Sequence, residues 1–384
     1  MVGGGQLARM THQAAIALGQ GLRVLAARAD DPAAQVSADV VLGEHTDLDA
    51  LRAVAAGATV LTFDHEHVPQ EHLAALVAEG VTVLPPPGAL LHAQDKLVMR
   101  TRLAELGAPV PPFAGVRTAA DVQVFGDTHG WPCVLKAVRG GYDGRGVWVL
   151  ERDEAAAVVD SQLAAGTPLM VEQRVDFARE LAAVVARSPF GQGAAWPVVQ
   201  TVQRDGICAL VLAPAPDLHP DLAEAAEQLA LRIAAELGVV GVLAVELFET
   251  RDGGLVVNEL AMRPHNSGHW SIEGARTSQF EQHLRAVLDY PLGDTSTTAP
   301  AIVMANVLGA PVAPAMTMDE RAHHLFARLP EAKLHLYGKS ERPGRKLGHV
   351  TVLGDDVVEV AERAERAAHW MSHAEWTDGW DPHA

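Results

Sequence analysis

The sequence has little cysteine, no long apolar segment and a deficit of positive charge. Only Cys133 and Cys208 occur in 384 residues, both within apolar runs, which excludes a disulfide framework and indicates a reducing compartment. There is no signal-peptide pattern and no uninterrupted apolar run of about eighteen residues, so we expect a cytoplasmic protein that does not enter a membrane. A net charge of −18 leaves no broad basic surface for nucleic acid.

What the chain does have is an apolar content of 48%, enough for two or three domains with substantial cores. Residues 1–95 alternate helical and strand patterns and predict a Rossmann-like α/β domain, with buried parallel strands at 24–26, 40–42, 60–63 and 81–84. Only Met1 and Val2 precede the turn at Gly3–Gly5, whereas a strand of about five residues normally does so. We therefore expect a truncated start and a loosely anchored turn.

The segment from Lys136 to Gly146 predicts a phosphate-binding loop that closes a β-hairpin. Strand patterns lie on both sides of it, at 133–135 and 147–150, whereas a Walker loop leads from a strand into a helix. Its glycines let backbone amides approach an anion, and Lys136 and Arg145 supply positive charge. The alternative is a flexible glycine turn with two solvated cations.

The hairpin belongs to a predicted small β-rich lid. A helix carrying Asp95 and Lys96 and a proline-rich linker at 109–112 lead into this segment, and a strand at 168–175 leaves it. A larger sheet begins near Glu180 and is covered by a helix over about 218–237. The expected domains are 1–95, 96–175 and 176–384, the last with a small terminal subdomain from about 297.

Two apolar strands around Asp252–Gly253 predict a second hairpin, in which Glu246 and Glu259 lie opposite each other. Opposed like charges in an apolar setting are destabilising unless a cation compensates. We therefore predict a Mg²⁺ site, with Mn²⁺ as an alternative ion and Asn258 as a further ligand. The competing interpretation is two glutamates on a solvated sheet face.

Two further polar segments predict binding of small anions. Arg263, His265 and Asn266 can bind a planar oxyanion and stabilise charge on it, while the His265–His269 spacing lacks a third soft ligand for zinc. His65 and His67 follow a strand end and are either ligands or surface residues. Four cations in an acidic chain suit a phosphate monoester or form a solvated turn. They are Lys339, Arg342, Arg345 and Lys346.

These motifs, in this order, resemble the ATP-grasp superfamily and, within it, the 5-(carboxyamino)imidazole ribonucleotide synthetase family of purine biosynthesis. The similarity runs nearly end to end and implies an α/β and α+β fold: a Rossmann-like parallel sheet, a β-rich lid and a larger mixed-sheet domain. It also implies a homodimer. Asp64 departs from the family, which often has a longer acid there.

The resemblance implies three groups of site residues. The ATP contacts are Lys96, Lys136, Gly140, Gly141, Tyr142, Asp143, Gly144, Arg145, Gly146, Glu172, Gln173, Arg174, Val175, Glu180 and Asn258. Catalysis falls to Arg263, His265 and Asn266, and magnesium to Glu246 and Glu259. The acceptor contacts are Gly5, Gln6, Leu7, Glu66, Tyr142, Asp143, Lys339, Arg342, Arg345 and Lys346.

The implied reaction joins bicarbonate to the amine of 5-aminoimidazole ribonucleotide at the expense of ATP, through carboxyphosphate. Two other ATP-grasp ligases, a formate-dependent glycinamide ribonucleotide transformylase and a biotin carboxylase, would share the lysines and carboxylates. The loop from His265 to His269 argues against both. A nucleotide sensor without catalysis would need no second anion cluster.

Overall fold

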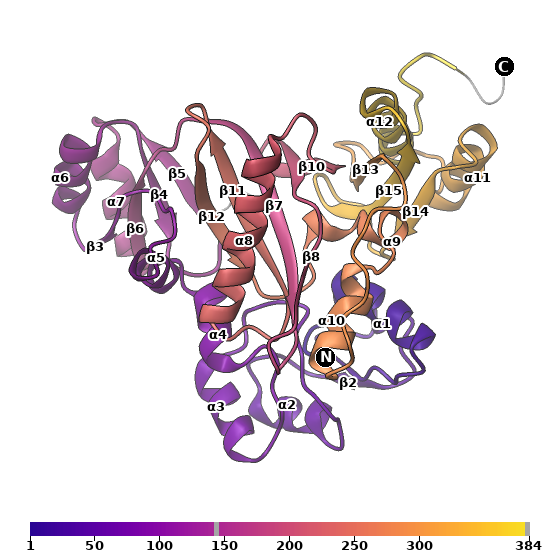
Figure 1. Ribbon diagram of the computed structural model, residues 1–384, viewed down its shortest axis with the longest axis horizontal. Helices are drawn as coiled ribbons and strands as arrows, with labels where there is room; N and C mark the ends of the chain where they lie inside the picture. The colour runs from indigo at the N-terminus through magenta and orange to yellow at the C-terminus, as the bar shows by residue number, and fades with distance from the viewer. Residues whose placement is uncertain (142–145, 381–384) are drawn as a thin grey trace.

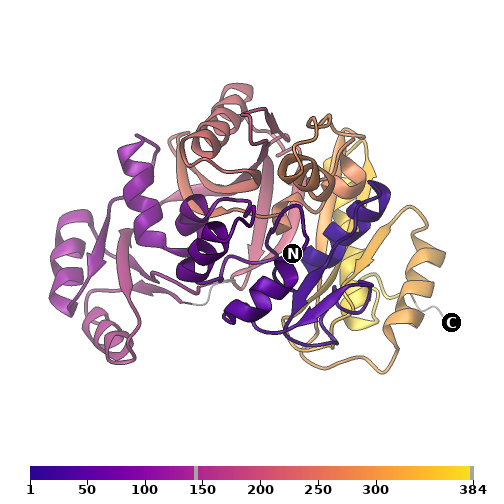
Figure 2. The same cartoon turned by 90° about the horizontal axis from the view of Figure 1, so that it is seen from below.

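In the computed structural model, residues 1–141 and 146–380 are described, and their strands form an N-terminal parallel sheet, a lid sheet and a large sheet (Figure 1). Tyr142, Asp143, Gly144 and Arg145 lie outside the described residues. Seen from below, the N-terminal segment lies between the lid and the C-terminal strands (Figure 2). No helix in the described part of the chain is long and apolar enough to cross a membrane.

The N-terminal sheet is parallel, as predicted. β1 (Val24–Ala26) pairs with β2 (Val40–Leu42), and bridges from Val2 to Leu25 and Phe63 and from Leu61 to Val83 extend the sheet. The expectation that 40–42 is buried is wrong, because β2 is an edge strand and Leu42 is exposed. The helices here are α1 (Gln6–Ala17), α2 (Leu48–Ala55) and α3 (Gln70–Ala78).

The expected loose anchoring of the glycine turn is also wrong. The amides of Val2 and Gly3 donate to Thr62 and Leu25, at 2.8 and 2.9 Å, and Met1 accepts from Leu25. Met1 and Val2 are buried between these neighbours. Met1 and Val2 therefore hold the turn in the sheet, because they bond to neighbours on both sides.

The lid is antiparallel, with strand order β3-β6-β4-β5, and two helices pack on it. Its elements are β3 (Phe113–Val116), α6 (Ala119–His129), β4 (Cys133–Ala137), β5 (Val147–Leu150), α7 (Ala155–Ala164) and β6 (Leu169–Gln173). Lys136 pairs with Val147, so the glycine loop closes a hairpin as predicted. Asp95 does not lie within a helix but joins α4 (Pro87–Gln94) to α5 (Lys96–Glu105).

The large sheet has the order β12-β11-β7-β9-β10-β13-β15-β14, with β8 beside β7. Its strands are β7 (Phe177–Arg187), β8 (Gly193–Ala195), β9 (Val199–Arg204), β10 (Ile207–Ala213), β11 (Gly241–Thr250), β12 (Leu255–Ala261), β13 (Ala301–Leu308), β14 (Lys333–Leu336) and β15 (Lys346–Gly354). Its helices are α8 (Pro220–Glu236), α9 (Ser271–Gly274), α10 (Gln279–Val287), α11 (Met318–Arg328) and α12 (Val357–His373), with a 3-10 turn, η1 (Asn266–Gly268).

One hydrophobic core joins the N-terminal sheet to the large sheet. It contains Val2, Leu61 and Met99 together with Val245 and Leu260. The lid has a separate core around Leu135 and Val171. The lid thus has a core of its own, as do β13, β15 and α12, while β11 and β12 are packed against the N-terminal segment.

Candidate active site

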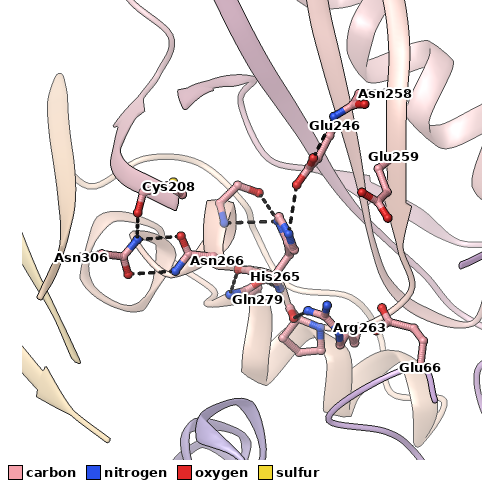
Figure 3. Close-up of polar contacts among 12 residues, drawn as sticks. Glu66, Cys208, Glu246, Asn258, Glu259, Arg263, His265, Asn266, Gln279 and Asn306 are labelled. Carbon is pink, nitrogen blue, oxygen red and sulfur yellow. Dashed lines mark hydrogen bonds and ion pairs between the residues drawn. The ribbon is translucent and has the colours of Figure 1, made fainter. Parts of the chain in front are cut away.

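Two carboxylates face each other at the centre of the site. Glu246 of β11 and Glu259 of β12 are register partners, as predicted, although the register next to the turn alone would place Asn258 opposite Glu246 (Figure 3). Between them and the turn the register shifts, because Leu247 pairs with Val257 and Asn258 becomes an extra residue of β12. The shift places the Asn258 amide 3.3 Å from Glu246 Oε2, to which it donates.

Each carboxylate is held by a cationic or proton-donating group. Lys96, at the start of α5, donates to Glu259 Oε1. His265 Nε2 lies 3.2 Å from Glu246 Oε1. The amide of Ser267 donates to His265 Nδ1 at 3.4 Å, so the proton of a neutral ring lies on Nε2 and points at Glu246.

The surroundings of Glu246 favour its ionised form. Burial alone would raise the pKa of Glu246, but the hydrogen bond from His265 and the charges of Lys96 and Lys136 hold it below the usual value. Burial, followed by repulsion from Glu246, raises the pKa of nearby Glu180. Among the described residues, no three His, Cys, Asp or Glu side chains are placed to hold one metal ion. A metal ion at the Glu246–Glu259 pair would therefore have at most these two side chains of that kind as ligands.

Lys136 of β4 connects the lid to this pair. It lies 3.2 Å from Asn258 Oδ1 and forms an ion pair with Glu172 of β6. Arg100 holds the other Glu172 oxygen at 3.0 Å. Burial raises the pKa of Glu172, but the two cations overcome it and leave the pKa below its usual value.

The glycine loop begins beside Lys96, whose amide donates to Val138 at 2.9 Å. Gly140 and Gly146 have φ of 80° and 73°, which favours glycine.

The predicted adenine-binding residues after Glu172 lie in different elements. Gln173 ends β6 and donates to His129 of α6, whereas Arg174 and Val175 lie in the connection to β7.

Arg263 and Glu66 join the large sheet to the N-terminal sheet. Arg263 Nε donates to Glu66 Oε2 at 2.8 Å, and Glu66 Oε1 is buried without a hydrogen-bond partner. Burial opposes the charge of Arg263, but Glu66 raises the pKa of the guanidinium. Two residues predicted separately are therefore an ion pair, with one carboxylate oxygen free for a ligand.

The Asn266 side chain is paired with another amide. Asn266 and Asn306 of β13 exchange two hydrogen bonds of 3.0 and 2.8 Å, and Asn306 also donates to the Cys208 carbonyl (Figure 3). One hydrogen and one lone pair remain on Asn266 for a substrate.

The N-terminal glycine turn and the late cation cluster lie together. Lys339 Nζ donates to Gln6 Oε1 at 2.6 Å. The Gly5 amide is bound by Asp64 Oδ2 at 2.7 Å, and Ala8 by Oδ1 at 2.8 Å, so Asp64 occupies the start of α1. The Gly5 amide thus bonds to Asp64 in this structure, and Leu7 packs in a core with Tyr337.

The remaining predicted cations line the segment between β14 and β15. Arg345 donates to the Ser340 hydroxyl at 2.7 Å, Arg342 is exposed, and Lys346 begins β15.

The rings of His65 and His67 stack with their centroids 5.4 Å apart. Burial is the largest cause that lowers the pKa of His65, and the charges of two neighbouring histidines lower it further, to about 3.

Sequence reasoning missed Arg100, Gln279 and Asn306. Arg100 lies one helical turn after Lys96, a spacing that places both cations on one face. Asn306 interrupts an otherwise apolar strand, which is a visible signal. Gln279 follows the helix-capping residue Ser278, and nothing in its local sequence marks it.

Comparison with known proteins identifies the family. Residues 101–280 match the ATP-grasp domain, residues 1–94 the ribonucleotide synthetase preATP-grasp domain, and residues 302–363 the phosphoribosylaminoimidazole carboxylase C-terminal domain. The N5-carboxyaminoimidazole ribonucleotide synthase of Mycobacterium bovis is 70% identical over 385 residues, covering 100% of this chain and 90% of that protein. The chain belongs to the N5-carboxyaminoimidazole ribonucleotide synthase family. The family and fold class predicted from the sequence are confirmed, and the chain is an ATP-dependent ligase.

Other relatives agree. The enzyme of the same name from Corynebacterium ammoniagenes is 52% identical, over 99% of this chain and 93% of its own. The Thermus thermophilus synthetase structure has a TM-score of 0.85 and 37% identity, with 99% and 100% of the two chains covered. The Aspergillus clavatus synthase, solved with ADP and 5-aminoimidazole ribonucleotide, has a TM-score of 0.86 and 32% identity, with 96% and 98% covered.

Proposed function

We propose that this chain carboxylates 5-aminoimidazole ribonucleotide with bicarbonate, releasing ADP and phosphate. One observation carries the proposal: the hydrogen bond from His265 to Glu246 joins the loop assigned to the acceptor to the carboxylate pair assigned to the nucleotide. Bicarbonate attacks the γ-phosphate of ATP to give carboxyphosphate, which delivers a CO₂ equivalent to the amine. A site that must pass a labile intermediate from one substrate to the other needs its two halves in contact.

The nucleotide half consists of the lid and the β11–β12 hairpin. Lys96, Lys136 and the glycine loop would hold the phosphates, Glu172–Val175 the adenine, and Glu180 the ribose. Lys96 forms an ion pair with Glu259, and Lys136 forms one with Glu172. Both lysines are therefore placed to bind anionic oxygens, as phosphate binding would require.

The Glu246–Glu259 pair fits a divalent cation. Two opposed carboxylates with an amide beside them are the oxygen ligands that Mg²⁺ prefers, and Mn²⁺ would accept the same set. When bound, the cation would neutralise phosphate charge. The protein's part is to keep Glu246 ionised, which its lowered pKa supports.

The acceptor half consists of the start of α1, the Arg263–Glu66 pair, the loop after β12 and the cations between β14 and β15. The unpaired Glu66 oxygen would accept a hydrogen bond from the acceptor amine, and Arg263 would bind the carboxylate being transferred. Lys339, Arg342, Arg345 and Lys346 would hold the ribonucleotide phosphate. Gln6 accepts a hydrogen bond from Lys339 and would help to orient it toward that phosphate.

The experiment is release of ADP measured with each acceptor in turn, with and without bicarbonate. We expect release to depend on both 5-aminoimidazole ribonucleotide and bicarbonate. Release with glycinamide ribonucleotide and formate, or with biotin, would overturn the proposal. Light scattering tests the homodimer that the resemblance implies.

A further inference from the structure

Gln279, the first residue of α10, is fully buried directly beneath the loop after β12 (Figure 3). Its Oε1 accepts from the His265 amide at 2.8 Å, and its Nε2 donates to the His265 carbonyl at 2.8 Å. Both main-chain groups of one residue are thus bound by one carboxamide. Only a side chain with an adjacent donor and acceptor can do this.

The same amide also reaches the far end of the loop. Gln279 Nε2 lies 2.9 Å from His269 Nδ1, and since the nitrogen can only donate, Nδ1 accepts. A Cβ on Gly268 would lie 2.4 Å from Gln279 Oε1, so glycine is required for this close approach. The amide therefore fixes the loop at both ends, without touching Glu246.

We propose that Gln279 is a positioning residue of the reaction, which orients the His265 imidazole onto Glu246. The inference rests on the proposed function. His265 has its main chain fixed by Gln279 and its ring fixed by Ser267 and Glu246. Without the main-chain contacts to Gln279, the His265 ring can turn away from Glu246. The substitution would have this effect although it changes no atom that touches a substrate.

The chain supplies a matched control on the same helix. Gln282 is equally buried, and it also binds one main-chain amide and carbonyl, those of Gly293, at 2.7 and 2.9 Å. Gly293 lies outside the site. Gln279→Met and Gln282→Met each remove a buried carboxamide that holds a loop, so a purely structural role predicts the same outcome for both.

The test compares the two variants for melting temperature, KM for ATP, KM for the ribonucleotide, and kcat. We expect similar losses of melting temperature, but a fall in ribonucleotide-dependent kcat of about 10- to 100-fold for Gln279→Met alone, the scale of lost support behind a functional ligand. The KM for ATP should stay unchanged in both. Equal kcat values for the two variants, or an equal rise in both KM values for Gln279→Met, would overturn the proposal.

If Gln279→Met does not fold, Gln279→Glu is the variant to measure. It keeps the shape of the side chain and the oxygen that accepts from the His265 amide, but it loses the Nε2 donor to the His265 carbonyl. It should retain more kcat than Gln279→Met; full wild-type kcat would contradict the role. Failure of the proposed function gives a different result, because the unaltered chain would then show no ribonucleotide-dependent turnover.

Discussion

Glu246 lies between the two halves of the proposed site. It accepts from His265 on the acceptor side and from Asn258 on the nucleotide side, while facing Glu259 across the hairpin. On the proposed assignment, its charge attracts the cation and strengthens the hydrogen bond from His265. A neutral amide of the same shape keeps an oxygen that accepts from His265 but loses the charge.

Glu246→Gln should reduce ATP turnover and raise the Mg²⁺ concentration for half-maximal rate at least tenfold, since a charged contact contributes about 1.5–3 kcal/mol. The measurement is a Mg²⁺ titration of ADP release. Glu249→Gln, on the same strand but paired with Arg179, is the control and should leave the titration unchanged. Normal turnover and Mg²⁺ dependence in Glu246→Gln would remove the metal assignment.

Arg345→Ala should raise the KM for the ribonucleotide by about 10- to 150-fold, the equivalent of one charged hydrogen bond. The KM for ATP should not change, because Arg345 lies beside Ser340 and away from the lid. Arg204→Ala, which removes an exposed ion pair with Glu365, controls for loss of charge. A parallel rise in both KM values would place Arg345 outside the acceptor site.

At the scale of elements, the lid is tied to α5 by the Arg100–Glu172–Lys136 group, which is almost wholly buried. Glu172→Gln leaves two cations against a neutral amide and should cost about 3–5 kcal/mol of unfolding free energy. Because the folded-state pKa of Glu172 is depressed below its usual value of 4.5, this stabilisation is present above that value and is lost as the pH falls through the folded pKa.

The check is chemical denaturation of both proteins across acidic pH. The difference in unfolding free energy should be largest at neutral pH and shrink as the pH falls below about 4.5. A difference that does not depend on pH would show that the loss comes from packing rather than charge.

Contacts between residues close in the sequence could be predicted, whereas contacts between distant segments could not. The pairing of Glu246 with Glu259 was predicted from a two-residue turn at Asp252–Gly253, but the turn is longer, because Glu249 pairs with Leu255. That register alone would place Asn258 opposite Glu246, and the extra residue at Asn258 restores Glu259 to this position. No local pattern predicts such a bulge. Arg263 and Glu66 were each identified, yet their ion pair depends on how two sheets meet, and no local pattern encodes that.

At the scale of the whole molecule, the cores define which parts unfold together. The N-terminal sheet and the β7–β11–β12 region share one core, whereas the lid core around Leu135 draws only on lid residues. Elements that share buried side chains open cooperatively, and a part with its own core can open alone. The proposed nucleotide half of the site therefore lies between the shared core and the lid, and we expect the lid to open without the shared core.

Leu135→Ala should destabilise the lid by about 2–5 kcal/mol while leaving the rest of the chain protected, because Leu135 is fully buried in the lid core. Leu61→Ala, a matched change in the shared core, should lower protection in both the N-terminal sheet and β11–β12. Hydrogen exchange read by peptide distinguishes the two. Adding ADP with Mg²⁺ should restore lid protection in Leu135→Ala, since ligand bound between lid and hairpin stabilises the closed arrangement. Loss of protection in β11–β12 in Leu135→Ala would show instead that the lid and the large sheet unfold as one unit.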